Sequence, residues 1–327
     1  MSEAENKSWK RTPPPPRWLA APLGVLILGI YWPITKLFPG WWPRFVGRTV
    51  TKFLSEFPKT FRPEERDVLV CSYYKSGTNW TMQIAVQIAY RGRAEFEHIH
   101  DLVPWPDMAR RAGYAVPLEV DEPQRSAPTG LRIIKTHLAL DDLPYSRAAR
   151  YICVVRDPKD VFVSSYHFTR AMVLGPLMPS VGRWLDTFLS PDAPIGSWAR
   201  HLASGWRLRD SGNVLFLTYD GMRADLSKAV DKIAAFMDVQ LTREERAAVI
   251  ERSSFAYMKK IEHKFEAPGA PWASPKGSMM RRGESGASGE LITLEQQRRI
   301  DDYWRAELER IGCDFPYDAA FNVAEPG

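Results

Sequence analysis

Short apolar runs alternate with amphipathic stretches along most of the chain. Runs with the length and composition of buried strands occur at 68–74, 131–138, 150–156 and 214–220. Apolar residues at helical spacing occur at 80–90, 157–168, 228–239 and 294–312. Strands separated by helices predict a parallel sheet with crossover connections, so the pattern indicates an α/β domain.

The N-terminal part of the chain has a different pattern. Residues 1–17 are polar and rich in proline, and the run from Trp18 to Thr35 contains no charged residue. This run is at the lower limit of length for a membrane-spanning helix, and basic residues flank it on both sides. A straight helix would be weakened by its internal prolines and glycines, which are Pro22, Gly24, Gly29 and Pro33.

From this pattern we expect residues 18–45 to lie on a membrane, or to dip into it, without crossing it. The alternative is an apolar arm that packs on the chain's own domain. We divide the chain into an extension, residues 1–49, and a single domain, residues 50–327. The protein is expected to be cytoplasmic and associated with the membrane through the extension.

Charge and cysteine content narrow the classes of ligand. The 327 residues carry a formal net charge of +5. This mild excess suits an anionic small molecule or a membrane surface, and it is too weak and scattered to indicate nucleic acid. The three cysteines, Cys71, Cys153 and Cys313, show no paired spacing, which argues against a disulfide framework and a zinc site. We expect reduced thiols and no metal.

The first candidate site follows the first predicted strand. The sequence YYKSGTNW, residues 73–80, places Lys75, Ser76, Gly77 and Thr78 between a strand and a helix. Backbone N–H groups converge in such a turn, and the helix N-terminus adds positive potential. The segment predicts a phosphate-binding turn, although a nucleotide-triphosphate loop would need a longer glycine-rich lead. The alternative is an ordinary strand–helix turn with a surface lysine.

Two further candidates follow later strands. Arg156 ends the strand 150–156, at the edge where open α/β sheets bind ligands, and Ser164 follows two helical turns later. Arginine can hold a phosphate through two hydrogen bonds, and the alternative is a surface pair with Asp160. His137, in the sequence KTHL, could act as a general base near neutral pH. Its alternative is a buried structural histidine.

These three segments, in this order, resemble the sulfotransferase family that uses 3′-phosphoadenosine 5′-phosphosulfate (PAPS), and its soluble, small-molecule branch in particular. The resemblance runs from Phe61 to Pro316. YYKSGTNW is similar to the family's 5′-phosphosulfate loop, VVRDPKDVFVSSYHF to its 3′-phosphate segment, and KTHL to its catalytic histidine strand. The resemblance implies a P-loop-like three-layer fold, in which helices flank a central parallel sheet on both faces.

The resemblance also implies roles for individual residues. Those implied for the 5′-phosphosulfate are Lys75, Ser76, Gly77, Thr78 and Asn79. Those implied for the adenine are Trp80, Tyr219, Ser253 and Phe255. Those implied for the 3′-phosphate are Arg156, Ser164, Arg281, Arg282 and Gly283, the last three in a glycine-rich loop that would close as a lid.

For catalysis, the resemblance implies transfer of a sulfuryl group from PAPS to a hydroxyl or amine, with no metal. His137 would take the acceptor's proton, and Lys75 would stabilise the leaving phosphate. Ser76 would steer Lys75 between donor and product, and Lys135 would be a second cation near the transferred group.

The sequence departs from the family in its dimer motif, which has a lysine, then Thr-Val, then a glutamate. The corresponding positions here are Gly289, Thr293, Leu294 and Arg298, so we do not expect that dimer contact. For the acceptor we expect a hydrophobic alcohol, phenol or sterol, because two segments are rich in aromatic residues: Trp105, Tyr114, Tyr166, Phe168 and Trp184. Two alternatives stay open: a nucleotide kinase-like phosphotransferase, and an inactive, membrane-associated nucleotide-binding protein.

Overall fold

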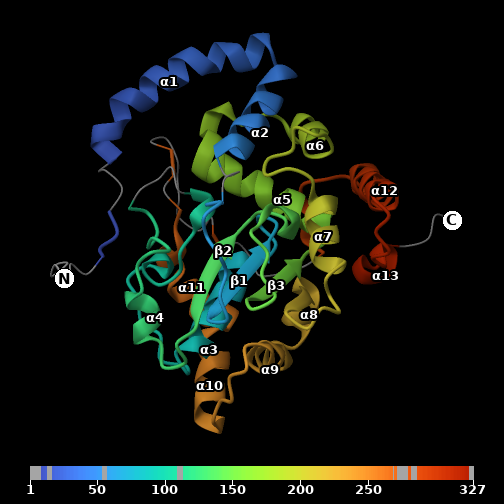
Figure 1. Cartoon of the computed structure of the whole chain (residues 1–327). Coiled ribbons are helices and arrows are strands. Elements are labelled where there is room, and N and C mark those ends of the chain that lie inside the picture. Colours follow the sequence, from blue (N-terminus) through green and yellow to red (C-terminus); the bar gives the residue numbers. More distant parts are fainter. Residues whose placement is uncertain are drawn as a thin grey trace.

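The structure is a computed structural model, which describes residues 9–12, 17–53, 57–108, 113–267, 269–270, 279–280 and 286–323. Its centre is one four-stranded parallel sheet with the strand order β2-β1-β3-β4 (Figure 1). The strands are β1 (Asp67–Ser72), β2 (Arg132–Thr136), β3 (Arg150–Val155) and β4 (Val214–Thr218). The predicted parallel sheet is therefore confirmed.

Helices surround this sheet. The α-helices are α1 (Arg17–Leu37), α2 (Trp41–Phe53), α3 (Thr78–Ala89), α4 (Glu122–Ser126), α5 (Pro158–Thr169), α6 (Val181–Phe188), α7 (Trp198–Trp206), α8 (Tyr219–Ala224), α9 (Leu226–Phe236), α10 (Arg243–Arg252), α11 (Phe255–Lys260), α12 (Leu294–Arg310) and α13 (Tyr317–Phe321). Short helical turns are η1 (Ile99–Asp101), η2 (Pro106–Met108), η3 (Leu140–Asp142), η4 (Arg170–Leu174), η5 (Gly175–Leu177), η6 (Glu262–Phe265) and η7 (Ala287–Glu290).

Alternate residues of each strand face opposite layers of helices, as the two-residue period of a strand requires. On one face, Val68 and Val70 of β1 belong to a core that includes residues of α3, α9 and α10. On the other face, Leu69 and Cys71 pack beside Cys153, against which α7 lies closely. A Cβ atom on Gly205 of α7 would lie 2.9 Å from the Cys153 sulfur, so only glycine allows this approach. The sheet is thus covered on both faces, as expected for three layers.

All four strands end earlier than their apolar runs predict, and β3 stops at Val155, one residue short of its run. β1 stops at Ser72, two residues before the end of its run, and β2 stops at Thr136. β4 stops at Thr218, because the Thr218 hydroxyl accepts a hydrogen bond from the Gly221 N–H and begins α8. The earlier ends leave the residues of the candidate site in loops at the carboxyl edge of the sheet.

The N-terminal apolar run forms one continuous helix, α1, although it contains Pro22 and Pro33. Figure 1 shows it as a long blue helix that lies along the outside of the molecule next to α2. Leu28 and Tyr31 pack against the same core as α5, α6 and α12. This tertiary packing holds a helix that proline and glycine weaken in isolation. Among the helices that the structure describes, none is long and apolar enough to cross a membrane.

The helix after α1 is anchored in the domain. Trp42 and Val46 of α2 are buried in this core. The Trp42 indole N–H donates a hydrogen bond of 2.8 Å to the Leu177 carbonyl of η5. Two residues that the sequence analysis assigns to the extension therefore contribute to the packed core.

Candidate active site

The loop between β1 and α3 has the backbone of an anion-binding turn. Lys75 and Gly77 both adopt positive φ, of 64° and 98°, and α3 begins at Thr78. Within the described chain no side chain caps the first amides of α3, because its N-cap residue is Gly77. A Cβ atom on Gly77 would lie 2.7 Å from the Tyr219 ring, so glycine is required both by φ and by space. The first N–H groups of α3 are thus available to an anion.

Two serine hydroxyls support a polar ligand at this edge of the sheet. The side-chain oxygens of Ser76 and Ser253 are buried and have no hydrogen-bond partner among the described residues. Buried hydroxyls are usually satisfied, so such groups indicate a missing partner. The resemblance assigns Ser76 to the phosphosulfate and Ser253 to the adenine side, and both oxygens fit a polar ligand that lies across this edge.

Arg156 directly follows β3 and lies beside the phosphate-binding turn. Its guanidinium donates a hydrogen bond of 3.3 Å to the Lys75 carbonyl and lies 4.3 Å from the centre of the Tyr219 ring. It also pairs with Asp160 at 3.4 Å, but both side chains are largely buried, so this is not a surface ion pair. Ser164 is half-buried on α5. Arg156 and the turn can therefore act on one ligand.

Two aromatic rings meet on the predicted adenine side, beside the segment that contains Ser253. The Trp80 indole N–H donates to the Ser253 carbonyl at 2.8 Å, and the rings of Trp80 and Tyr219 meet edge to face at 5.5 Å. Phe255, the first residue of α11, is 45% exposed. This arrangement offers aromatic surface to the adenine ring of a nucleotide. Asn79 is half-buried in the first turn of α3, and Arg281, Arg282 and Gly283 lie outside the described residues.

His137 lies immediately after β2 and has a defined tautomer. Its Nδ1 atom lies 2.8 Å from the Ser72 carbonyl oxygen. Because a carbonyl only accepts, Nδ1 carries the proton, and Nε2 of the neutral ring has the lone pair of a base. Burial, and then the positive charge of Lys135, hold the pKa of His137 well below its usual range. The ring is therefore neutral at pH 7.

Two lysines flank this histidine. The Lys135 ammonium lies 3.3 Å from the centre of the Trp105 ring, and the Lys75 ammonium lies 4.2 Å from that of Phe168. Burial lowers the pKa of Lys135 to about 7. Burial and the nearby Arg156 lower the pKa of Lys75 to about 8. For both lysines burial outweighs the effect of the nearby carboxylates, Asp107 and Glu262, and an anionic donor would add further negative charge.

The structure adds a residue to the site that the sequence analysis did not single out. Asp107 of η2 accepts hydrogen bonds from the Thr136 hydroxyl at 2.9 Å and from the His137 backbone N–H at 2.6 Å. Burial raises its pKa to about 6. In the sequence Asp107 is one acidic residue in a loop, and only the contact between η2 and β2 shows its position.

The aromatic residues expected near the acceptor divide into two groups. Trp105 lies edge to face with His137 at 5.4 Å, and Tyr114 lies 6.1 Å from Trp105. Phe168 contacts the Lys75 ammonium. Trp184 and Tyr166, by contrast, are buried in the core around α5 and α6. Trp105, Tyr114 and Phe168 are thus the aromatic residues of this group beside the reactive side chains.

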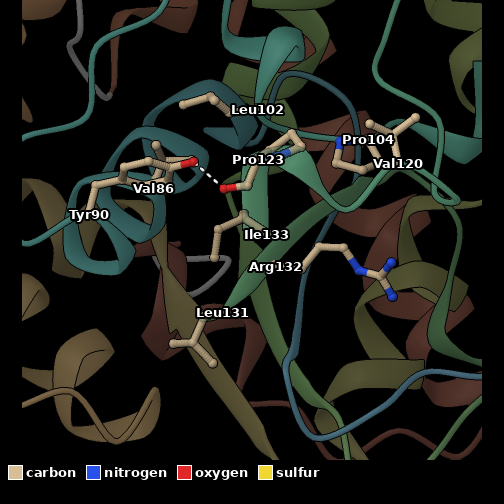
Figure 2. Close-up of a pocket in the computed structure, with 9 residues that line it drawn as sticks. All are labelled: Val86, Tyr90, Leu102, Pro104, Val120, Pro123, Leu131, Arg132 and Ile133. Carbon is tan, nitrogen blue, oxygen red and sulfur yellow. Dashed lines mark hydrogen bonds between the residues drawn. The ribbon is translucent and has the colours of Figure 1, made fainter. Parts of the chain in front are cut away.

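Figure 2 shows a different, small pocket between α3 and β2, which is separate from this site. Its lining is mostly apolar, with Tyr90 hydrogen-bonded to the Pro123 carbonyl. The Arg132 guanidinium points away from the pocket and pairs with Asp67 at 2.7 Å. In the described ranges, no group of three or more His, Cys, Asp or Glu side chains could hold a metal ion.

Known proteins resemble this chain over most of its length. The family model for the sulfotransferase domain matches residues 65–312. Sulfotransferase 1C2 of Rattus norvegicus is 28% identical over 271 residues, covering 79% of this chain and 88% of that protein. Sulfotransferase 1B1 of Canis lupus familiaris is 30% identical over 266 residues, covering 78% and 88%. The chain belongs to the sulfotransferase family.

Solved structures share the fold. A crystal structure of mouse sulfotransferase SULT7A1 complexed with PAP has a TM-score of 0.61 and 25% identity, and covers 84% of this chain and 94% of that one. A structure of retinol dehydratase in a complex with retinol and PAP has a TM-score of 0.60 and 21% identity, and covers 83% and 88%. The predicted P-loop-like three-layer fold is confirmed. The protein is a PAPS-dependent sulfotransferase, with PAPS as its co-substrate.

Proposed function

We propose that this sulfotransferase transfers the sulfuryl group of PAPS to a hydroxyl or amine of a lipophilic small molecule, with His137 as the general base. One observation carries the proposal. The His137 ring keeps its proton on Nδ1 through the Ser72 carbonyl, and it lies at the same sheet edge as the phosphate-binding turn of Lys75. A base and an anion-binding turn on adjacent strands suit transfer of an anionic group to a hydroxyl.

In the proposed step, the acceptor oxygen forms a bond to sulfur while the bond from sulfur to the bridging phosphate oxygen breaks. The acceptor proton goes to Nε2 of His137, and the bond electrons stay on the phosphate oxygen of the product adenosine 3′,5′-bisphosphate (PAP). Lys75 neutralises the charge that develops on this oxygen, and Lys135 acts on the transferred group. Ser76, with its unpaired buried hydroxyl, steers the Lys75 ammonium.

The donor would lie across the carboxyl edge of the sheet. The first amides of α3, with Thr78 and Asn79, would bind the 5′-phosphosulfate. Arg156 and Ser164 would bind the 3′-phosphate, and we keep Arg281, Arg282 and Gly283 as a proposed lid over it. The adenine would lie among Trp80, Tyr219, Ser253 and Phe255.

Arg156→Ala is expected to weaken the binding of PAP by roughly 10- to 100-fold, because a charged hydrogen-bonding partner of the 3′-phosphate is lost. Binding of adenosine 5′-phosphate, which lacks the 3′-phosphate, should fall much less. Calorimetry with both nucleotides measures the difference, and Arg223→Ala on α8 serves as an arginine control. Equal losses for the two nucleotides would remove Arg156 from the 3′-phosphate site.

The acceptor is proposed to be a hydrophobic alcohol, phenol or sterol. Trp105, Tyr114 and Phe168 supply apolar surface beside His137 and Lys75. Release of PAP from PAPS, measured with a panel of phenols, sterols, aliphatic alcohols and amines, tests the activity and the acceptor class together. Activity with acidic saccharides alone would contradict the lipophilic class. The family assignment leaves the kinase-like alternative without support, and an absence of turnover with every acceptor would favour the inactive binding protein.

We also propose that the extension attaches the enzyme to the cytoplasmic face of a membrane that contains anionic lipids. One side of α1 packs on the domain, and the opposite side exposes six large apolar side chains that are 52% to 72% exposed: Leu23, Val25, Leu26, Ile30, Trp32 and Leu37. Soluble proteins rarely expose a continuous apolar surface of this kind, and such surfaces mark interaction sites.

The charge around α1 favours a lipid surface as the partner. Residues 17–53 contain no Asp or Glu and five basic residues, which are Arg17, Lys36, Arg44, Arg48 and Lys52; of these, Arg48 pairs with Asp192. Anionic headgroups complement this charge, and Trp32 and Trp41 have the amphipathic rings that favour the membrane interface. In this proposal residues 50–327 form the catalytic domain, and the extension brings it to acceptors dissolved in the bilayer.

Replacing Leu23, Leu26 and Ile30 together with serine is expected to lower binding to vesicles of phosphatidylcholine and phosphatidylserine at least about tenfold, because less apolar area enters the bilayer. Cosedimentation measures it, and turnover of a water-soluble acceptor should stay unchanged. Substitution is preferable to deletion, because Trp42 and Val46 are part of the core. Leu294→Ser, at a residue 73% exposed on α12, is the matched control. Wild-type protein that stays in the supernatant would contradict the attachment.

A further inference from the structure

We propose that Asp107 is a positioning residue for sulfuryl transfer, which holds His137 in place through hydrogen bonds and sets a negative charge near Lys135. The inference rests on the roles proposed above for His137 and Lys135, and it adds a third group that acts through both of them.

The geometry connects Asp107 to two members of the KTHL segment, Thr136 and His137. Its carboxylate accepts hydrogen bonds from the His137 backbone N–H at 2.6 Å and from the Thr136 hydroxyl at 2.9 Å and 3.2 Å. It also accepts one from the Trp105 indole N–H at 3.2 Å. Together with the Ser72 carbonyl, which fixes Nδ1 of His137, the carboxylate holds the histidine backbone and the aromatic ring beside it.

Asp107 is also the negative group in a positively charged neighbourhood. Lys135 interacts electrostatically with Lys75 from the loop after β1 and with Asp107 from η2. Three histidines also feel the Lys135 charge, namely His98, His100 and His137. Asp107 raises the pKa of Lys135 against the lowering effects of burial and of Lys75. Without this carboxylate, Lys135 would lose its proton at lower pH.

Both the hydrogen bonds and the charge of Asp107 bear on why this position holds an aspartate. Asp107 is 2% exposed, and burying a carboxylate is costly unless hydrogen bonds and a positive charge offset it. The hydrogen bonds to Asp107 use both carboxylate oxygens, whereas an asparagine has a single carbonyl oxygen and could not accept all of them. The carboxylate also carries a negative charge that interacts with Lys135, and asparagine would remove this charge.

The test compares Asp107→Asn with wild-type enzyme across pH, with PAPS and an acceptor that the wild type sulfates. The variant is expected to lower kcat at pH 7 by roughly 10- to 100-fold, because it removes a charged hydrogen-bond acceptor from the reacting residues. PAP binding by calorimetry should stay within about threefold, since the hydrogen bonds given above for Asp107 go to Thr136, His137 and Trp105, and not to the described residues that are assigned to the nucleotide. The alkaline limb of the kcat profile should move to lower pH, because Lys135 then loses its proton more easily.

Thr136→Val provides a second, independent measurement if Asp107→Asn does not fold. The lost hydroxyl no longer stabilises the charged carboxylate, so the pKa of Asp107 rises from about 6. The acid limb of the kcat profile should therefore move to higher pH. A purely structural role for Asp107 would lower the melting temperature of both variants and leave the limbs in place. Asp231→Asn, on the exposed face of α9, is the matched control.

The outcomes separate the two proposals. A wild-type enzyme that releases no PAP with any acceptor would overturn the proposed function. The role of Asp107 alone would be overturned if the wild type is active, the kcat values of Asp107→Asn and Thr136→Val lie within twofold of it, and neither pH limb moves.

Discussion

His137→Ala is expected to lower kcat for sulfuryl transfer roughly 100- to 10,000-fold, the range that a positioned general base contributes. The acceptor proton would have no nearby base, because Nε2 of His137 is the lone-pair nitrogen that the Ser72 carbonyl leaves available. Binding of PAP, measured by calorimetry, should survive, since the histidine lies outside the groups assigned to the nucleotide. His263→Ala, at an exposed histidine of η6, should behave as wild type.

The pKa of His137 also predicts the direction in which kcat changes with pH. The pKa of His137 lies well below its usual range, so the neutral, basic form predominates at pH 7. Protonation of this base, as distinct from protonation of Asp107, should lower the rate at a pH below the usual pKa of a histidine. A turnover within about tenfold of wild type in His137→Ala would remove this residue as the base.

Lys75→Met is expected to lower kcat by roughly 100- to 1,000-fold, the cost of removing one group that stabilises charge in a transition state. Methionine keeps most of the length and apolar character of the lysine side chain, so its packing near Phe168 is largely retained. Stopped assays of PAP release from PAPS, with donor and acceptor at saturation, measure the effect on kcat.

The charge of Lys75 sets a second upper pH limit, besides the one that we assign to Lys135. The pKa of Lys75 is about 8 in the protein without donor, so the stabilising charge is lost as the pH rises through this region. An anionic donor raises the pKa and moves this limit upward. Lys232→Met, at an exposed lysine of α9, is the control for removing a positive charge. A kcat of Lys75→Met equal to that of Lys232→Met would contradict the role.

The sequence by itself determined the order of the elements and the place of the site. Each apolar run of strand length became a strand of the parallel sheet, because a strand buried on both faces has no polar alternation and can be recognised as a continuous run. The carboxyl ends of parallel strands meet at one edge. Lys75, His137 and Arg156 could therefore be assigned to one region before any contact was known.

Other features depended on the tertiary structure. Local propensity argued against a straight α1, because of Pro22 and Pro33, but packing of Leu28 and Tyr31 on the domain stabilises the helix. Trp105 and Trp184 both lie in segments rich in aromatic residues, and the sequence does not distinguish them. Only Trp105 lies beside His137, because the crossover connections decide which loop reaches the sheet edge.

Asp107 shows the same limit most clearly. It is 30 residues from His137 in the chain, and its carboxylate accepts the His137 backbone N–H at 2.6 Å. No local pattern indicates such a contact, because periodicity reports which face of an element is buried and not which distant loop satisfies its polar groups. The sequence determined which residues could do chemistry at this edge, and only the packing of η2 on β2 decided which carboxylate lies beside them.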